Sequence, residues 1–165
     1  MKLPRNLTQL QALNDEIIQS LRDAFVPCLK KHLDHVGGLE FVILYGSRAR
    51  GDYGYASDVD LIVCSNGFEK IRVVDRPDLV SSCIDNVHVE PVCYTVEDAR
   101  MALEQGKLTM LDALEEGLTL FSQGRILERL KQVFEVLKKT NVIQRVDPSM
   151  KGVHWNVADI MPFEL

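Results

Sequence analysis

Two aspartates stand at the head of an apolar run in the stretch "YGSRARGDYGYASDVDLIV". Residues two apart in an extended chain point to the same side, so Asp58 and Asp60 are expected to project together from the start of a strand. Neighbouring carboxylates repel, which raises the pKa of one of them unless a cation lies between them. A hard divalent cation such as Mg²⁺ takes oxygen ligands, and paired carboxylates often hold it in phosphoryl or nucleotidyl transfer. The pair therefore predicts a metal site for phosphate chemistry.

The Gly-Ser pair that precedes these aspartates fits the same chemistry. A strand that ends at Gly46-Ser47 and turns into a short helix presents free backbone N–H groups, which form an anion site with the serine hydroxyl. Gly46 also allows the backbone to approach a phosphate closely. Arg48 and Arg50 are close enough in sequence to contact phosphate oxygens, although each is also compatible with a solvated surface position. Gly46, Ser47, Arg48 and Arg50 are thus the expected nucleotide-binding residues.

Hydrophobic periodicity predicts helices around a small mixed sheet. Apolar residues at helical spacing indicate N-terminal helices over about 6–36, which Pro27 breaks or kinks and Gly37-Gly38 ends. Strands are expected in "LEFVILYG", "DVDLIVC", "NVHVEPVCYT" and "LTLFS", and later helices near Asp78 to Cys83 and in "VEDARMALEQG", "KLTMLDALEEG" and "GRILERLKQVFEVLKKT". This order favours a single α/β (α+β) domain over 1–165, with a core at about 39–122 and a C-terminal helix and tail at 123–165.

The spacing of "GS" and "DVD" resembles the signature of the DNA polymerase β-like nucleotidyltransferase superfamily, and "GSRARG" followed by "SDVDLIV" is similar to its minimal nucleotidyltransferases. The resemblance covers about Leu39 to Tyr94 well and the flanking helices loosely. It implies the polymerase β-like fold, with Asp58 and Asp60 holding two metal ions, Mg²⁺ or Mn²⁺. It also implies a third carboxylate that helps to activate an acceptor hydroxyl. That hydroxyl attacks the α-phosphate of a nucleoside triphosphate, ATP being favoured, and pyrophosphate leaves.

Glu90, in "HVEPV", is the position that matches the third carboxylate of the family, as both a catalytic and a metal-binding residue. The family more often has aspartate there, and a surface strand residue is the alternative interpretation of Glu90. Pro91 keeps Glu90 extended and indicates an edge strand or a strand end. Asp85 is a poorer candidate because "IDN" is typical of a turn. His88 is expected to be a partner for a nearby acid rather than a base.

The charge and the length of the chain limit the kinds of acceptor molecule that it is expected to use. The net charge of −5 predicts no broad basic surface, and 165 residues leave no room for the extra domains of a templated polymerase. A protein side chain, a small molecule or an RNA end delivered by a partner remains as acceptor. The resemblance implies a HEPN-type protein partner, with the chain acting as the antitoxin of a toxin–antitoxin pair that adenylylates a tyrosine of the toxin. A homodimer is also compatible with the helix stripes.

Alternative functions stay open at this point. The fold can have lost its chemistry and serve as a module that binds a nucleotide or a partner protein. Small-molecule transfer of the aminoglycoside type is a second enzymatic option. A Ca²⁺ site without nucleotide would account for the acids but leaves Gly46-Ser47 unexplained.

The termini and the cysteines indicate a cytoplasmic protein. The N-terminal "MKLPRNLTQLQALNDE" contains no apolar signal-peptide core, and no run approaches the length of a membrane span. Cys28, Cys64, Cys83 and Cys93 are scattered, with no C-x-x-C pair, and no histidine is expected at ligand spacing from them. They are expected to be reduced thiols that form neither a disulfide nor a metal site.

The C-terminal tail is more apolar than a disordered segment that makes no contacts. It carries Trp155, Ile160, Met161, Phe163 and Leu165. The tail is expected to dock either on its own domain or on a partner.

Overall fold

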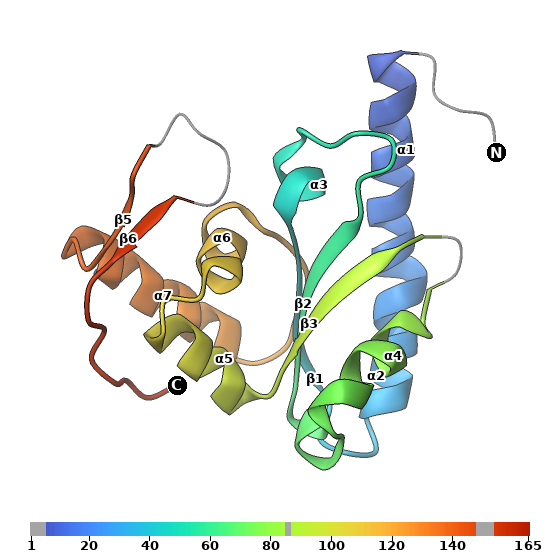
Figure 1. Cartoon of the computed structure of the whole chain (residues 1–165). Helices are drawn as coiled ribbons and strands as arrows, with labels where there is room; N and C mark the ends of the chain where they lie inside the picture. Colours follow the sequence, from blue (N-terminus) through green and yellow to red (C-terminus); the bar gives the residue numbers. More distant parts are fainter. Residues whose placement is uncertain (1–5, 85–86, 148–153) are drawn as a thin grey trace.

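A four-stranded mixed sheet forms the centre of the computed structural model, which describes residues 6–84, 87–147 and 154–165 (Figure 1). The strand order is β3-β2-β1-β4, with β2 parallel to β3 and β1 antiparallel to both β2 and β4. The strands are β1 Leu39–Tyr45, β2 Val59–Ser65, β3 Val89–Tyr94 and β4 Leu118–Ser122. The observed fold class is therefore the predicted one, a mixed sheet flanked by helices, and the four predicted strands are confirmed.

Helices from the first half of the chain cover one face of this sheet (Figure 1). They are α1 Leu7–Ser20, α2 Val26–Leu33 and α4 Arg76–Ser81. Alternate residues of β1 and β2 point into the core on this side, because side chains of a strand alternate between its faces. The 3₁₀ segments Asn66–Lys70 and Val73–Asp75 lead from β2 to α4.

Of the two effects predicted for Pro27, a break or a kink, the break does not occur. The chain stays helical from α1 through a π-helical segment, Leu21–Phe25, into α2, and Pro27 lies in the first turn of α2. A proline lacks an N–H and its ring crowds the carbonyl one turn earlier. The wider π-turn just before Pro27 accommodates this defect without ending the helix.

Helices from the second half of the chain cover the opposite face (Figure 1). They are α5 Val96–Glu104, α6 Leu108–Glu116 and α7 Ile126–Lys139. The core on this side contains Phe41 and Ile43 of β1 together with Ile62 of β2. The short helix α3 Gly46–Arg50 begins directly where β1 ends, as the Gly-Ser turn predicted. This arrangement leaves the end of β1 and the start of β2 between the two helical layers.

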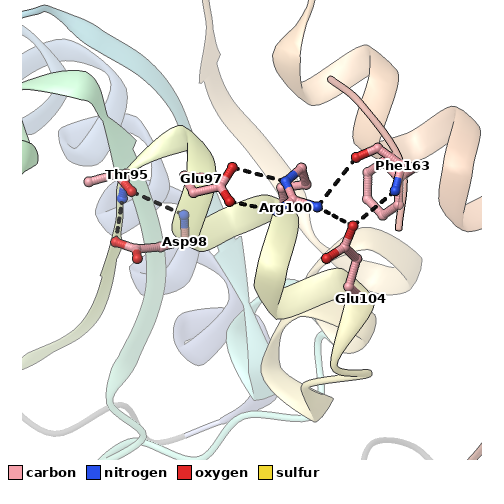
Figure 2. A network of polar contacts seen from close by, with 6 residues as sticks. All are labelled: Thr95, Glu97, Asp98, Arg100, Glu104 and Phe163. Carbon is pink, nitrogen blue, oxygen red and sulfur yellow. Dashed lines mark hydrogen bonds and ion pairs between the residues drawn. The ribbon is translucent and has the colours of Figure 1, made fainter. Parts of the chain in front are cut away.

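The apolar tail docks on its own domain. The tail contains a hairpin that the sequence did not predict, formed by β5 Ile143–Arg145 and β6 Trp155–Val157. Trp155 Nε1 donates to Asp112 Oδ1 of α6 at 2.8 Å, and its ring packs edge-on against Phe134 of α7. Further along, the Phe163 N–H donates to Glu104 Oε1 at 2.9 Å and Arg100 donates to the Phe163 carbonyl (Figure 2). Both contacts tie the end of the chain to α5.

The prediction of reduced thiols is wrong for two of the four cysteines. Cys28 and Cys83 form a disulfide between α2 and the turn after α4, whereas Cys64 and Cys93 are free. The two bonded residues are separated by 55 positions, so only the tertiary fold, which places the turn after α4 beside α2, brings them together. In the part of the chain that the structure describes, no helix has the length and apolar character needed to cross a membrane.

Candidate active site

A row of polar side chains crosses three adjacent strands, at the end of β1 and the starts of β2 and β3. In the register, Asp60 of β2 lies opposite Tyr45 of β1 and beside Glu90 of β3. Directly paired residues on neighbouring strands point to the same face, so these three side chains share the face that α5, α6 and α7 cover. β3 is one of the two edge strands of the sheet, as Pro91 predicted. An edge position leaves Glu90 exposed to solvent and accessible to a substrate.

Asp58 and His88, which come just before β2 and β3, form a cluster of metal-binding groups with Glu90, and this cluster does not include Asp60. Donor atoms of Asp58, His88 and Glu90 all lie within 4.8 Å of one another. His88 Nδ1 lies 3.0 Å from Asp58 Oδ1, which confirms the prediction that His88 is a partner for a nearby acid. All three residues are exposed. The alternative candidate Asp85 lies outside the described residues.

Asp60 lies close to the like charges of Glu90 and Asp58. Its pKa is raised above the ordinary aspartate range, first by partial burial and then by the charges of Glu90 and Asp58. Arg50 and Arg48 oppose this rise. Burial and Asp60 also raise the pKa of Tyr45, to about 12, so Tyr45 stays neutral beside the acids. A cation among the carboxylates would relieve their repulsion.

Gly46 joins the turn to the carboxylates. Its φ of +71° lies in the left-handed region, which side chains with a Cβ disfavour. A Cβ at this position would lie 3.0 Å from the Asp60 carboxyl carbon and closer still to Oδ2. The absent side chain therefore lets the backbone of the turn pass directly against the Asp60 carboxylate. The Gly-Ser turn and the acids meet at this point.

Arg48, one of the predicted phosphate contacts, is buried beside the loop that leads to β2. Its side chain is only 6% exposed, and Nε donates to the carbonyls of Ser57 and Asp58 at 3.0 and 3.2 Å. Nη1 donates to Asn14 Oδ1 of α1 at 3.1 Å, and the ring of Tyr53 lies 5.7 Å from the guanidinium carbon. These contacts favour a structural role for Arg48, because its donors are directed at the loop that carries Asp58. Phosphate binding by Arg48 stays a prediction. Arg48 holds that loop against α1.

Arg50 lies close enough to Asp60 to oppose the rise of its pKa, and it is paired with two other carboxylates. Its Nε lies 3.3 Å from Asp52 Oδ1 and 3.7 Å from Glu116 Oε2 of α6, and Glu116 is also paired with Arg145 of β5. Ser47 is half-buried in the first turn of α3. Sequence reasoning missed Asn14, Tyr45 and Glu116 as neighbours of the site. For Tyr45 alone a signal was available, since it directly precedes Gly46 and falls two residues from Ile43 on the same face.

A cavity of about 360 Å³ adjoins the carboxylate cluster. Asp58 and His88 line it on one side, and the apolar residues Leu13 and Ile17 of α1 line it on the other. Tyr55, 39% exposed, contributes a ring from the intervening loop. The cavity therefore offers an apolar wall within reach of the acids, which suits a ring of a reactant.

A match to a protein-family model identifies the family of this chain. A model of the nucleotidyltransferase domain matches residues 28–164, from α2 to the end of the tail. This chain belongs to the nucleotidyltransferase domain family. The predicted transferase role and the predicted superfamily follow from this membership, and no curated protein matches the chain.

Solved structures also resemble this nucleotidyltransferase domain. A candidate nucleotidyltransferase from Sulfolobus solfataricus is 21% identical with a TM-score of 0.49, and the match covers 74% of this chain and 93% of that one. A toxin–antitoxin structure with AMP-PNP is 18% identical with a TM-score of 0.44, covering 78% and 88%. A structure of tri-AMPylated Shewanella oneidensis HEPN toxin with MNT antitoxin is 19% identical with a TM-score of 0.39, covering 79% and 88%. These low scores assign neither a substrate nor a partner to this nucleotidyltransferase domain.

Proposed function

We propose that this domain moves a nucleoside monophosphate from a nucleoside triphosphate, with ATP preferred, to an acceptor hydroxyl. The observation that carries the proposal is the contact between Gly46 and Asp60. It places a turn that can accept phosphate directly against the row of carboxylates. Nucleotidyl transfer needs both groups at one point, because the triphosphate and the acids must share the same cations.

The donor set fits a hard divalent ion, Mg²⁺ or Mn²⁺. Asp58 and Glu90 lie in one cluster of donor atoms, and Asp60 lies beside Glu90 in the sheet and carries a pKa raised partly by the other two charges. These three residues would hold the ion. When bound, it would neutralise charge on the triphosphate and orient it.

The remaining residues position the reactants. The backbone N–H groups at Gly46 and Ser47 and the serine hydroxyl bind the phosphates of the donor, and Arg50 supplies positive charge beside them. Glu90 accepts the proton of the acceptor hydroxyl. The hydroxyl oxygen forms a bond to the α-phosphorus, the bond from the α-phosphorus to the bridging oxygen breaks, and pyrophosphate leaves with that oxygen. Most of the rate gain would come from orientation and from charge stabilisation.

The acceptor that we favour is a tyrosine of a HEPN-type protein, which makes the chain an antitoxin that works in the cytoplasm. The support is the resemblance of "GSRARG" and "SDVDLIV" to the minimal nucleotidyltransferases. The test is transfer of label from α-labelled ATP to a co-expressed HEPN-type protein. Labelling that survives replacement of the acceptor tyrosine by phenylalanine would exclude this acceptor while leaving the transfer reaction intact.

The transfer site itself is tested by calorimetric titration of ATP, GTP, CTP and UTP with Mg²⁺ into two double variants and the wild type. Asp58→Asn/Asp60→Asn removes the acids of the site, and Asp34→Asn/Asp78→Asn removes two exposed carboxylates elsewhere. We expect metal-dependent binding of one triphosphate to the wild type and to the control, and its loss in the first variant. Equal binding to all three proteins, or to none, would contradict the proposal.

A further inference from the structure

Cys28, His32 and Cys83 form a cluster of metal-binding groups that the proposed transfer reaction does not use. Cys28 and His32 lie four residues apart on α2, so they share one face of the helix. This is a ligand spacing that the sequence analysis overlooked. Cys83 follows the C-terminal end of α4. His32 Nδ1 lies 3.4 Å from Cys83 Sγ and 3.9 Å from Cys28 Sγ, and the three donor atoms lie within 4.8 Å of one another.

We propose that these three residues bind one Zn²⁺ ion when the disulfide is reduced. Two thiolates and an imidazole are the ligands that zinc prefers over the hard oxygen-binding cations. In a tetrahedral site with ordinary bond lengths, sulfur and nitrogen ligands lie about 3.5 Å apart. The two observed distances from His32 bracket this value. The histidine is thus already placed as a ligand beside both sulfurs.

The position of the cluster suits a site with an open fourth ligand. Cys28 and Cys83 are half-buried between the two helices, and His32 is exposed. Water can therefore complete the coordination from the solvent side. Because α2 and α4 come from distant parts of the sequence, the ion would replace the covalent link between them with a coordinate one.

The disulfide and the zinc site exclude each other, because zinc needs both sulfurs as thiolates. A dithiol reductant supplies two electrons that break the Cys28–Cys83 bond and is itself oxidised to a disulfide. Its two protons pass to the protein sulfurs. Zinc binding then releases these two protons to solvent as the thiolates form. The thiol–disulfide state of the cluster therefore controls whether metal binds.

The experiment uses Co²⁺ as a spectroscopic probe, with Zn²⁺ as competitor. The protein is reduced with dithiothreitol, and the reductant is then removed under anaerobic conditions. The reduced protein is titrated with Co²⁺ in parallel with the oxidised protein. We expect thiolate-to-cobalt charge-transfer absorption that saturates at one equivalent in the reduced protein and disappears when Zn²⁺ is added. The oxidised protein should lack this absorption. Its absence from the reduced protein, or its persistence in Cys28→Ser/Cys83→Ser, would overturn the proposal.

Two further variants keep the experiment specific. His32→Ala should weaken Zn²⁺ binding by roughly a hundredfold or more, since even outer-shell partners of zinc contribute about 10–100-fold. His35→Ala, which removes an exposed histidine just beyond α2, should leave Zn²⁺ affinity unchanged. Asp58→Asn/Asp60→Asn should keep the charge-transfer band, because that band reports sulfur ligands alone. Equal affinity in the two histidine variants, or loss of the band in the aspartate variant, would contradict the assigned ligands.

Discussion

At the scale of single residues, Gly46 is the residue of the turn that lies against Asp60. Two separate constraints apply there, a positive φ and the lack of space for a Cβ beside Asp60. Gly51, at the end of α3, has a φ of +83° but open space around its missing Cβ. The two glycines therefore separate the cost of backbone strain from the effect of displacing a carboxylate.

We expect Gly46→Ala to lower nucleotidyl transfer at least tenfold, because the new methyl group must push the Asp60 carboxylate away from the turn. Gly51→Ala should keep transfer close to the wild-type rate. Both variants should lose about 1 kcal/mol of unfolding free energy from the left-handed backbone. Urea unfolding and the transfer of label from α-labelled ATP give the two measurements. Equal transfer in both variants would refute a special role for the contact between Gly46 and Asp60.

At the scale of elements, the loop between α3 and β2 is held by Arg48 of α3, the helix that precedes it. Arg48 donates to the carbonyls of Ser57 and Asp58, which follow it in the sequence, and to Asn14 of α1, which precedes it. Its burial lowers the pKa of the guanidinium, although an arginine stays charged in proteins. The start of β2 is thus positioned by contacts with α1, which lies outside the sheet.

Arg48→Lys should destabilise the domain by about 2 kcal/mol, since a lysine cannot reproduce a fork that bonds to several acceptors. We expect a lower kcat, because Asp58 loses its support, and a nearly unchanged KM for the triphosphate. Arg50→Lys is the matched control and should change the unfolding free energy little. Denaturant unfolding and steady-state kinetics check this pair. A raised KM with unchanged stability in Arg48→Lys would instead favour direct phosphate binding.

At the scale of the whole molecule, the C-terminal tail completes the layer that covers the site-bearing face. Trp155 holds the buried Asp112 of α6, and the Arg100 network ties Phe163 and the last residues to α5 (Figure 2). Arg145 of the hairpin pairs with Glu116, which in turn lies beside Arg50. A segment far from the motif in sequence is therefore connected to the site through two ion pairs.

Trp155→Phe should lower the unfolding free energy by about 1–3 kcal/mol, because the Asp112 carboxylate is left buried without its donor. The same substitution in an Asp112→Ala background should cost less, since no acceptor remains to be left unpaired. The double-mutant cycle, measured by urea unfolding, isolates this coupling. Equal costs in the two backgrounds would show that the ring packing of Trp155 matters and its hydrogen bond does not.

The sequence by itself determined the features that depend on local pattern. The four strands, the Gly-Ser turn and the positions of Asp58, Asp60 and Glu90 at strand starts follow from periodicity and motif spacing within short stretches. These features could be predicted because a residue's preference for a strand, a turn or a helix is expressed over a few neighbours. The edge position of β3 followed in the same way from Pro91.

Only the tertiary structure decided the features that depend on distant partners. Arg48 bonds to Asn14 of α1, Cys28 pairs with Cys83 in the turn after α4, and Trp155 of the hairpin donates to Asp112 of α6. None of these partners is close in sequence. Periodicity shows which side of an element is buried but not which other segment covers it, since that choice depends on how all the elements pack together.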